Sequence, residues 1–110
     1  METIEPTLIK SITERKGTLK MLSNRGTIEI LCTFCCSQKK VRFNELAKLF
    51  NHISTKTLTS RLRELEKEKI LTRTSYNEIP PRVEYSMTQK GQSLVEALFP
   101  LIQWIANEKQ

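Results

Sequence analysis

The chain has 110 residues, 38% of them hydrophobic, and its 18 lysines and arginines outnumber 12 aspartates and glutamates, which gives a formal net charge of +6. This length holds one domain with a modest core. No apolar run reaches the roughly 18 residues of a membrane span, and the N-terminal segment contains glutamates and no long apolar stretch, unlike a secretory signal. The excess of positive charge favours a polyanionic partner. We therefore expect one cytoplasmic domain with no membrane partner.

Few residues in the chain are suited to catalysis or to metal binding. There is one histidine, His52, there is no glycine-rich phosphate loop, and most carboxylates are interleaved with cations. Three cysteines, Cys32, Cys35 and Cys36, crowd one apolar stretch, and the first two have CxxC spacing. A structural zinc site needs four ligands, whereas cysteine is often buried as a small apolar side chain. We expect no enzyme, no cofactor and no metal; a redox role for the three cysteines is the less favoured alternative.

Two helices are expected in the first third of the chain. Pro6 can begin the first, since proline suits the first turn of a helix, and apolar residues at helical spacing continue it to about residue 23, with an interruption at Gly17. The second is expected from Thr27 to about Ser37. Its apolar residues cover most of the helix circumference, which indicates a central, buried helix. Residues 41–42 are a candidate short strand.

The next segment has the layout of a helix-turn-helix. A helix is expected from about Phe43 to Phe50, because its apolar residues recur at i, i+3 and i+4. Asn51-His52 then makes a turn, in which either residue can supply a positive φ better than most residue types. Ser54 is a candidate N-cap for a second helix that runs to about Lys69. A short turn, a cap and a helix over residues 43–69 are typical of a helix-turn-helix.

The second helix of this pair has two different faces. At about 100° per residue, leucines gather on one face and cations and hydroxyls on the other, with no acidic residue before Glu64. Hydroxyls can donate to or accept from base edges, and lysine or arginine can pair with guanine. An ordinary amphipathic surface helix would show the same division, so the segment that follows decides in favour of DNA. The outer residues are Lys56, Thr59, Ser60, Arg63 and Lys67.

A β-hairpin is expected after this helix, over residues 70–87. Leu71 to Tyr76 and Val83 to Met87 are rich in strand-forming residues. Between them stand Ile-Pro-Pro-Arg at residues 79–82, and the prolines fix their own φ angles and restrict the residues before them. An arginine held at a stiff tip can reach a minor groove, where the negative potential is focused. We favour a DNA-binding wing over the alternative that Arg82 is merely solvated.

A long helix is expected at the end of the chain, capped by Thr88 and running to about Asn107. It carries more apolar surface than one side of a small domain can bury, and Pro100 should kink it or end its first half. Excess apolar surface on terminal helices usually marks an oligomer interface, and two-fold dimers are the commonest assembly. We therefore expect a homodimer; the alternative is that this helix packs over the N-terminal helix of the same chain. The expected interface residues are Leu8, Ile12, Leu98, Leu101, Ile102, Trp104 and Ile105.

Three stretches of the chain carry the motifs of a known family. They are RFNEL at residues 42–46, LTSRLRELE at residues 58–66, and PPRVEYSMT at residues 80–88 followed by Gly91. In them the chain, from Asn24 onward, resembles the HxlR-type family of winged helix-turn-helix transcription regulators, relatives of the MarR group. The first stretch is similar to the family's entry into the helix-turn-helix, the second to its recognition helix and the third to its passage from wing to last helix. Trp104 also falls where the family commonly has a tryptophan.

The resemblance implies a dimeric repressor or activator whose wings contact DNA, whose terminal helices form the dimer and whose operators have two-fold symmetry. Arg25-Gly26-Thr27 stands where the family usually has Lys-Trp-Thr, and His52 replaces a usual turn glycine. The thiol-sensing branch of the family uses a cysteine ahead of the helix-turn-helix, near the N-terminus, whereas the first cysteine here is Cys32. That departure weighs against the same sensing mechanism.

We predict an α+β, mainly α fold: one winged helix-turn-helix domain over residues 1–110, with a two-stranded β-wing and dimerisation helices at residues 1–23 and 88–107. The predicted function is a sequence-specific regulator that binds double-stranded DNA as a homodimer, with a small-molecule or redox effector left open. The alternatives are a non-specific architectural DNA binder and a protein-interaction module that has kept the fold. Base edges would be read by Lys56, Thr59, Ser60 and Arg63, and phosphates or the minor groove contacted by Lys39, Lys40, Ser54, Thr55 and Arg82.

Overall fold

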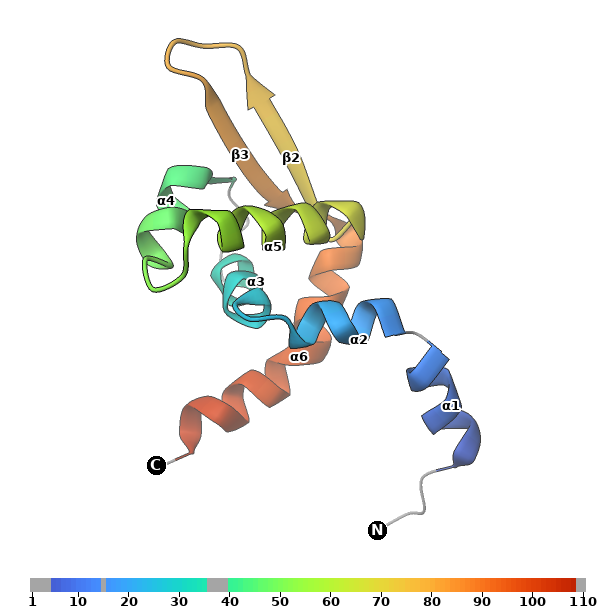
Figure 1. The fold of residues 1–110 in the computed structure, drawn as a ribbon. Helices are drawn as coiled ribbons and strands as arrows, with labels where there is room; N and C mark the ends of the chain where they lie inside the picture. The colour runs from blue at the N-terminus through green and yellow to red at the C-terminus, as the bar shows by residue number, and fades with distance from the viewer. Residues whose placement is uncertain (1–4, 15, 36–39, 109–110) are drawn as a thin grey trace.

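The computed structural model describes residues 5–14, 16–35 and 40–108. Within them the chain forms helices and a small three-stranded antiparallel sheet, in the winged helix-turn-helix arrangement that the sequence predicts (Figure 1). None of the described helices is both long and apolar enough to cross a membrane. In chain order the elements are α1 (Pro6–Glu14), α2 (Lys16–Ser23), α3 (Thr27–Cys35), β1 (Val41–Arg42), α4 (Phe43–Leu49), α5 (Thr55–Lys67), β2 (Leu71–Tyr76), β3 (Arg82–Met87) and α6 (Gln89–Asn107).

The sheet carries the wing and joins it to the helix-turn-helix. Its strand order is β1-β3-β2, and both pairs are antiparallel. β2 and β3 form a hairpin that stands out from the body (Figure 1), in a register that runs from Leu71 opposite Met87 at its base to Tyr76 opposite Arg82 at its outer end. β1 pairs with the other edge of β3. The predicted hairpin and the short strand before α4 are both confirmed.

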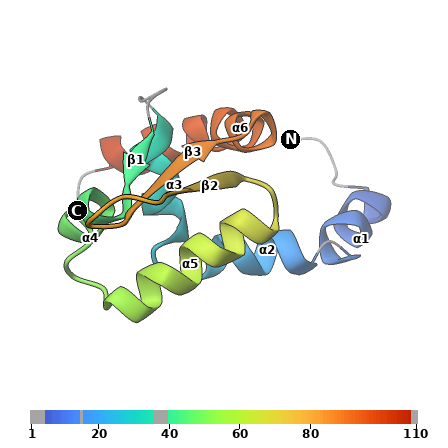
Figure 2. The same cartoon turned by 90° about the horizontal axis from the view of Figure 1, so that it is seen from above.

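The core lies between α3, α4, α5 and the base of the sheet. α3 is central, as predicted, and its Ile30 and Leu31 have no exposed surface. Leu58, Leu62 and Leu65 of α5 are at most 1% exposed, and burying a side chain of this size contributes about 1.5–3 kcal/mol. Seen from above, the strands lie between α5 and α6 (Figure 2). The apolar face of α5 therefore fixes its position and leaves its polar face in solvent.

A residue with a positive φ lies at the C-terminal end of α5, whereas the sequence predicted one at residues 51–52. The N–H groups of Lys69 and Ile70 donate to carbonyl oxygens of the last helical turn at 3.0 and 2.8 Å, which is the Schellman pattern. Lys69 has a φ of 61°. The expectation of a positive φ at residues 51–52 was wrong, because a backbone hydrogen bond of 3.1 Å from Ile53 to Phe50 closes that turn without one.

α6 begins where the wing returns to the body. Thr88 caps it, as predicted: its Oγ1 accepts from the Gly91 N–H at 3.0 Å and donates to the Lys69 carbonyl oxygen at 2.6 Å. A Cβ on Gly91 would lie 2.3 Å from the carbonyl oxygen of Ile70, so only glycine lets α6 start this close to the foot of β2. The end of α5, the foot of the wing and the start of α6 therefore form one hydrogen-bonded unit.

The predicted helix break at Gly17 was wrong, and one of the two outcomes expected at Pro100 is excluded. α1 ends at Glu14 and α2 begins at Lys16, so Gly17 lies inside the first turn of α2 and does not interrupt a helix. The conformational cost of glycine is greatest in the interior of a helix, so a glycine in the first turn is tolerated. Pro100 lies within α6 and does not end it, whereas a kink there stays a prediction. The hydrogen bond that a proline removes would go to the carbonyl of Glu96, an exposed residue, so water can take its place.

Candidate nucleic-acid interface

The outer face of α5 presents a stripe of polar side chains, which we call the reading stripe: Lys56, Thr59, Ser60 and Arg63. These residues recur at helical spacing and therefore share one side of the helix. Thr59 is partly buried and the other three are exposed. No acidic side chain lies on α5 before Glu64. Hydroxyls and cations in this arrangement can pair with base edges in a major groove.

Ser54 and Thr55 open α5, and their hydroxyls have different roles. Ser54 Oγ accepts from the Thr57 N–H at 3.0 Å and lies 3.0 Å from Thr57 Oγ1. It is therefore engaged as the helix cap, whereas Thr55 is exposed. The N-terminus of a helix carries a partial positive charge and free N–H groups. The start of α5 is thus favourable for a phosphate.

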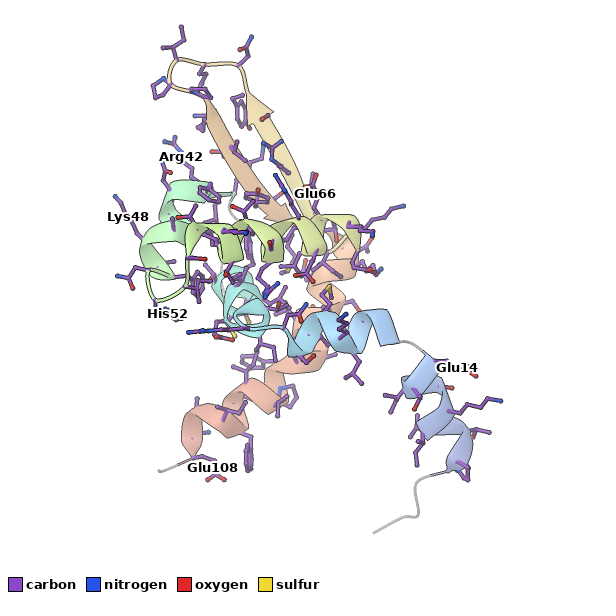
Figure 3. All side chains as sticks on the ribbon, viewed as in Figure 1. Glu14, Arg42, Lys48, His52, Glu66 and Glu108 are labelled. Atoms are coloured by element: carbon purple, nitrogen blue, oxygen red, sulfur yellow. The ribbon has the colours of Figure 1, made fainter. Side chains whose placement is uncertain are left out.

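A groove of about 990 Å³ separates α5 from the wing. Four arginines line it: Arg42 of β1, Arg63 of α5, Arg73 of β2 and Arg82 of β3. Figure 3 shows Arg42 on the side of the wing where α4 lies, and it shows Glu66 on α5, below the wing. Glu78 adds a second carboxylate, and the other lining residues are Phe43, Asn44, Thr59, Ile79, Pro80, Pro81, Val83 and Tyr85. Cations outnumber carboxylates here, directly beside the reading stripe.

Sequence patterns did not indicate Arg42 or Arg73 as interface residues. Side chains alternate along a strand, so Arg73 shares a face of β2 with the buried Leu71, and that face turns towards α5. The alternation of side chains along the strand, counted from Leu71, was the signal in the sequence that could have indicated Arg73. Arg42 comes to the groove through the pairing of β1 with β3, a contact between distant segments that carries no local signal.

Arg82 does not stand at the tip of the wing. It opens β3 opposite Tyr76, and its guanidinium carbon lies 4.0 Å from the Tyr76 ring centroid, within cation–π range. Its nitrogens lie 3.5 Å from a Glu78 carboxylate oxygen and 3.8 Å from one of Glu84. Exposed ion pairs contribute at most about 1 kcal/mol each, but together these contacts hold the side chain along the flank of the wing. The tip itself is residues 77–81.

Lys40 lies on the same flank. Its Nζ donates to the Tyr76 hydroxyl at 3.0 Å and lies 5.7 Å from the ring centroid. The hydrogen bond to Tyr76 is the main reason that the pKa of Lys40 is raised, so Lys40 is cationic throughout the ordinary pH range. Tyr76 thereby holds two cations just below the tip. Lys39, the other predicted phosphate contact in this segment, lies outside the described residues.

A second network ties α5 to the turn between α2 and α3. The Glu64 carboxylate accepts hydrogen bonds from Asn24 Nδ2 and Arg61 Nη1, both at 2.7 Å. Arg61 Nε donates to the Arg25 carbonyl oxygen, also at 2.7 Å. These bonds fix the rotation of α5 about its own axis and so the direction of the reading stripe. Sequence patterns did not indicate them, because the partners are 36 and 40 residues apart.

The opposite end of the molecule is apolar and uncovered. α1 has no buried residue, and its Leu8 and Ile12 are 54% and 48% exposed. The first half of α6 buries Val95 in the core. α1 and the end of α6 lie well apart in both views (Figures 1 and 2), so the alternative that they cover each other within one chain is wrong. On α6, Leu101, Trp104 and Ile105 are exposed, and Leu98 and Ile102 are partly buried.

The cysteines that the structure describes lie on α3. Cys32 and Cys35 are partly buried, and Cys35 packs against the core. Cys36 lies outside the described residues. Within the described ranges, no three histidine, cysteine or acidic side chains come together as metal ligands would.

Comparisons with known proteins agree with this architecture. The HxlR-like helix-turn-helix family matches residues 21–110. The HTH-type transcriptional regulator YtcD of Bacillus subtilis (strain 168), itself uncharacterized, is 38% identical over 92 residues, which are 84% of this chain and 71% of that protein. A regulator from Methanothermobacter thermautotrophicus is 41% identical over 75 residues, 68% of this chain and 56% of that protein. The chain thus spans little more than half the length of this second relative.

Solved structures give the same result. The redox regulator HypR in its oxidized form has a TM-score of 0.75 at 30% identity, over 84% of this chain and 94% of that one. A crystal structure of ytcD has a TM-score of 0.73 at 37% identity, over 84% of this chain and 92% of that one. The family match runs from α2 onward and includes the helix-turn-helix, the wing and α6. The protein therefore belongs to the HxlR-like helix-turn-helix family of DNA-binding transcriptional regulators.

Proposed function

We propose that the protein is a homodimeric regulator that reads operators of two-fold symmetry. One observation carries the proposal: the reading stripe and the arginine-lined groove lie at one end of the molecule, and the uncovered apolar helices lie at the other. A molecule built this way can pair through one end and leave two reading ends free. Because the proposed regulator reads chromosomal DNA, we place the protein in the cytoplasm. We assign it no enzymatic activity.

α5 is the element that enters the major groove. Its 13 residues make a rod about 20 Å long, and the groove is about 12 Å wide. Lys56, Thr59, Ser60 and Arg63 would meet base edges there. A second set of residues would hold the register on the backbone without reading sequence. They are Ser54 and Thr55 at the start of α5, Lys40 before β1, Arg82 on the wing, and Lys39, which precedes Lys40 in the sequence.

The apolar end supplies the dimer. Two-fold pairs are the commonest soluble assembly, and apolar helices that cover each other across such an axis would bury the side chains that a single chain leaves in water. A two-fold dimer of helix-turn-helix domains binds half-sites about 34–36 Å apart, or a multiple of that distance. The operator is therefore proposed to be an inverted repeat.

Selection of bound duplexes from a random library tests the proposal. The purified protein is mixed with the library at near-physiological salt, and the bound duplexes are sequenced. Enrichment of an inverted repeat supports base reading by a dimer. Binding without enrichment would replace the proposal with a non-specific architectural protein. No salt-sensitive binding to any duplex would instead leave a protein-interaction module.

A further inference from the structure

The tip of the wing exposes an apolar side chain. Ile79 is 102% exposed, whereas every other exposed large hydrophobic of the described residues lies between 43% and 62%. Hairpin tips are usually made of glycine, proline, asparagine, aspartate and serine, which suit turn conformations. An apolar side chain at such a tip leaves its surface in water, which is unfavourable. The loop between β2 and β3, to which Ile79 belongs, lies away from α1 and the end of α6 (Figure 1). A side chain so placed is accessible to a partner that meets the wing from outside.

The tip is stiff. Pro80 and Pro81 follow Ile79 directly, and each proline fixes its own φ. Below them Arg82 stacks on Tyr76 at 4.0 Å and pairs with Glu78 at 3.5 Å, which closes the two strands. Little conformational freedom is left for the tip to lose on binding, and rigid binding groups lose less entropy than flexible ones.

The reach of the wing matches the spacing of the grooves in duplex DNA. Each wing strand has six residues, which span about 20 Å. A minor groove lies about half a helical turn from the major groove, or roughly 17 Å along the axis. The wing and α5 lie at the same end of the molecule (Figure 1). With α5 in the major groove, the tip therefore meets the minor groove beside it.

The charges around the tip fit this partner. Lys40 and Arg82 both contact Tyr76 on one flank of the wing just below the tip, and Arg73 lies further down β2. These three cations outnumber the two carboxylates beside them, Glu78 and Glu84, with which Arg82 pairs. A minor groove is only about 6 Å wide and is bordered by two rows of phosphates. An apolar tip with an excess of cations behind it matches a groove whose base steps accept apolar wedges and whose rim is anionic.

We propose, building on the DNA-reading role above, that Ile79 enters this minor groove and wedges between neighbouring base pairs. Apolar side chains that enter a minor groove in this way unstack a base step and kink the duplex by about 20–90°. Pyrimidine–purine steps kink most easily, so each half-site would prefer such a step under the wing. This preference would arise from DNA deformability, without any hydrogen bond from Ile79.

Ring closure of short DNA measures the kink. The probe is a pool of duplexes of about 100 base pairs that the full-length protein retains, which is shorter than the persistence length of about 150 base pairs and so closes slowly by itself. The wild-type protein should speed ligase-catalysed ring closure by about tenfold or more, since bending such DNA is otherwise costly. Ile79→Ala should abolish the acceleration, and Ile79→Phe should restore it. Asn77→Ala, which trims a polar residue of the same tip, should keep it.

Two results separate failure of the wedge from failure of the DNA-reading role. If the wild-type protein binds these duplexes but does not speed ring closure, or if Ile79→Ala speeds it as well, the wedge is overturned and the DNA-reading role stands. If the wild-type protein retains no duplex, both are overturned, and Ile79 is then a contact for another protein. Ring closure is measured at saturating protein, so weaker binding by a variant is not mistaken for loss of the kink.

Discussion

The two ends of the molecule differ in how they are completed. The DNA-reading end is finished within one chain: the Ser54 cap, the Thr88 bonds and the network around Glu64 hold α5 and the wing in place. The apolar end is not, because α1 buries nothing and Ile105 is 53% exposed. Under the proposed function, the difference teaches that intrachain contacts set the geometry of the surface that reads DNA, whereas the spacing between two such surfaces would depend on a second copy.

The largest expected effect comes from the core that holds α5 in place. Leu62→Ala removes a side chain with no exposed surface and should lower the free energy of unfolding by about 2–5 kcal/mol. Leu49→Ala is the matched control, since Leu49 is 60% exposed and should change stability by less than about 0.5 kcal/mol. Urea denaturation at fixed protein concentration measures both. Equal losses would mean that the core is not where we place it.

The second largest effect is expected from a variant that disrupts the apolar end alone. Ile105→Glu puts a charge at the centre of the stripe formed by Leu98, Leu101, Ile102 and Ile105, and should weaken the dimer by about 2–4 kcal/mol, or roughly 30- to 1,000-fold. Gln103→Glu adds the same charge on the opposite side of α6 and should leave the dimer intact. Sedimentation over a range of concentrations measures the dissociation constant. A dimer that survives Ile105→Glu would contradict the assignment of this surface.

Within the reading end, base contacts can be separated from phosphate contacts. Arg63→Ala should cost about 1–3 kcal/mol and relax the preference at one base pair. Lys40→Ala should weaken all duplexes alike and reduce the salt dependence of binding. Titrations with selected and random duplexes at several salt concentrations distinguish the two outcomes. If Arg63→Ala weakens both kinds of duplex equally, it contacts phosphate and not a base.

Removing the contacts that hold the cations on the flank of the wing should have a smaller effect on DNA binding. Tyr76→Leu removes the ring beneath Arg82 and should weaken DNA binding by about two- to fivefold, the equivalent of 0.5–1 kcal/mol for an exposed cation–π contact. Tyr76→Phe keeps the ring and removes only the hydroxyl that Lys40 contacts at 3.0 Å. It should therefore retain most of the affinity. Identical losses in the two variants would show that the hydroxyl, and not the ring, orders this flank.

The smallest effect is expected from the cysteines. With Cys32, Cys35 and Cys36 all changed to serine, the protein should fold and keep its DNA affinity within about twofold, because the described pair is only partly buried. Adding a mild oxidant before the binding titration tests the redox alternative. A wild-type protein that loses affinity on oxidation, beside a triple variant that does not, would establish a thiol switch.

Features whose signals are local in the chain could be predicted from the sequence. Each of these local patterns predicts one helix or strand, and the structure confirms them: the caps Ser54 and Thr88, the leucines of α5 and the strand-forming runs of the wing. The left-handed Lys69 could not be predicted, because its carbonyl is held by Thr88, 19 residues further on. Tertiary contacts override the usual preference for glycine there.

The candidate site shows the same division. The reading stripe follows from helical periodicity, which is a property of neighbouring residues. The arginine-lined groove does not, since it requires the register of β2 with β3 and the pairing of β1. The position of Arg82 also depends on that register: a shift of one residue would have moved Arg82 into the loop, whereas the observed pairing opposite Tyr76 makes it the first residue of β3.

The most direct test of the division into two ends is to select duplexes with the wild-type and Ile105→Glu proteins side by side. The wild-type protein should enrich an inverted repeat with half-sites about one helical turn apart. The variant should enrich the same half-site, alone and with weaker binding, because its reading end is intact. Enrichment of the same repeat by both proteins would contradict the account, since pairing of the reading ends would then not depend on the apolar helices.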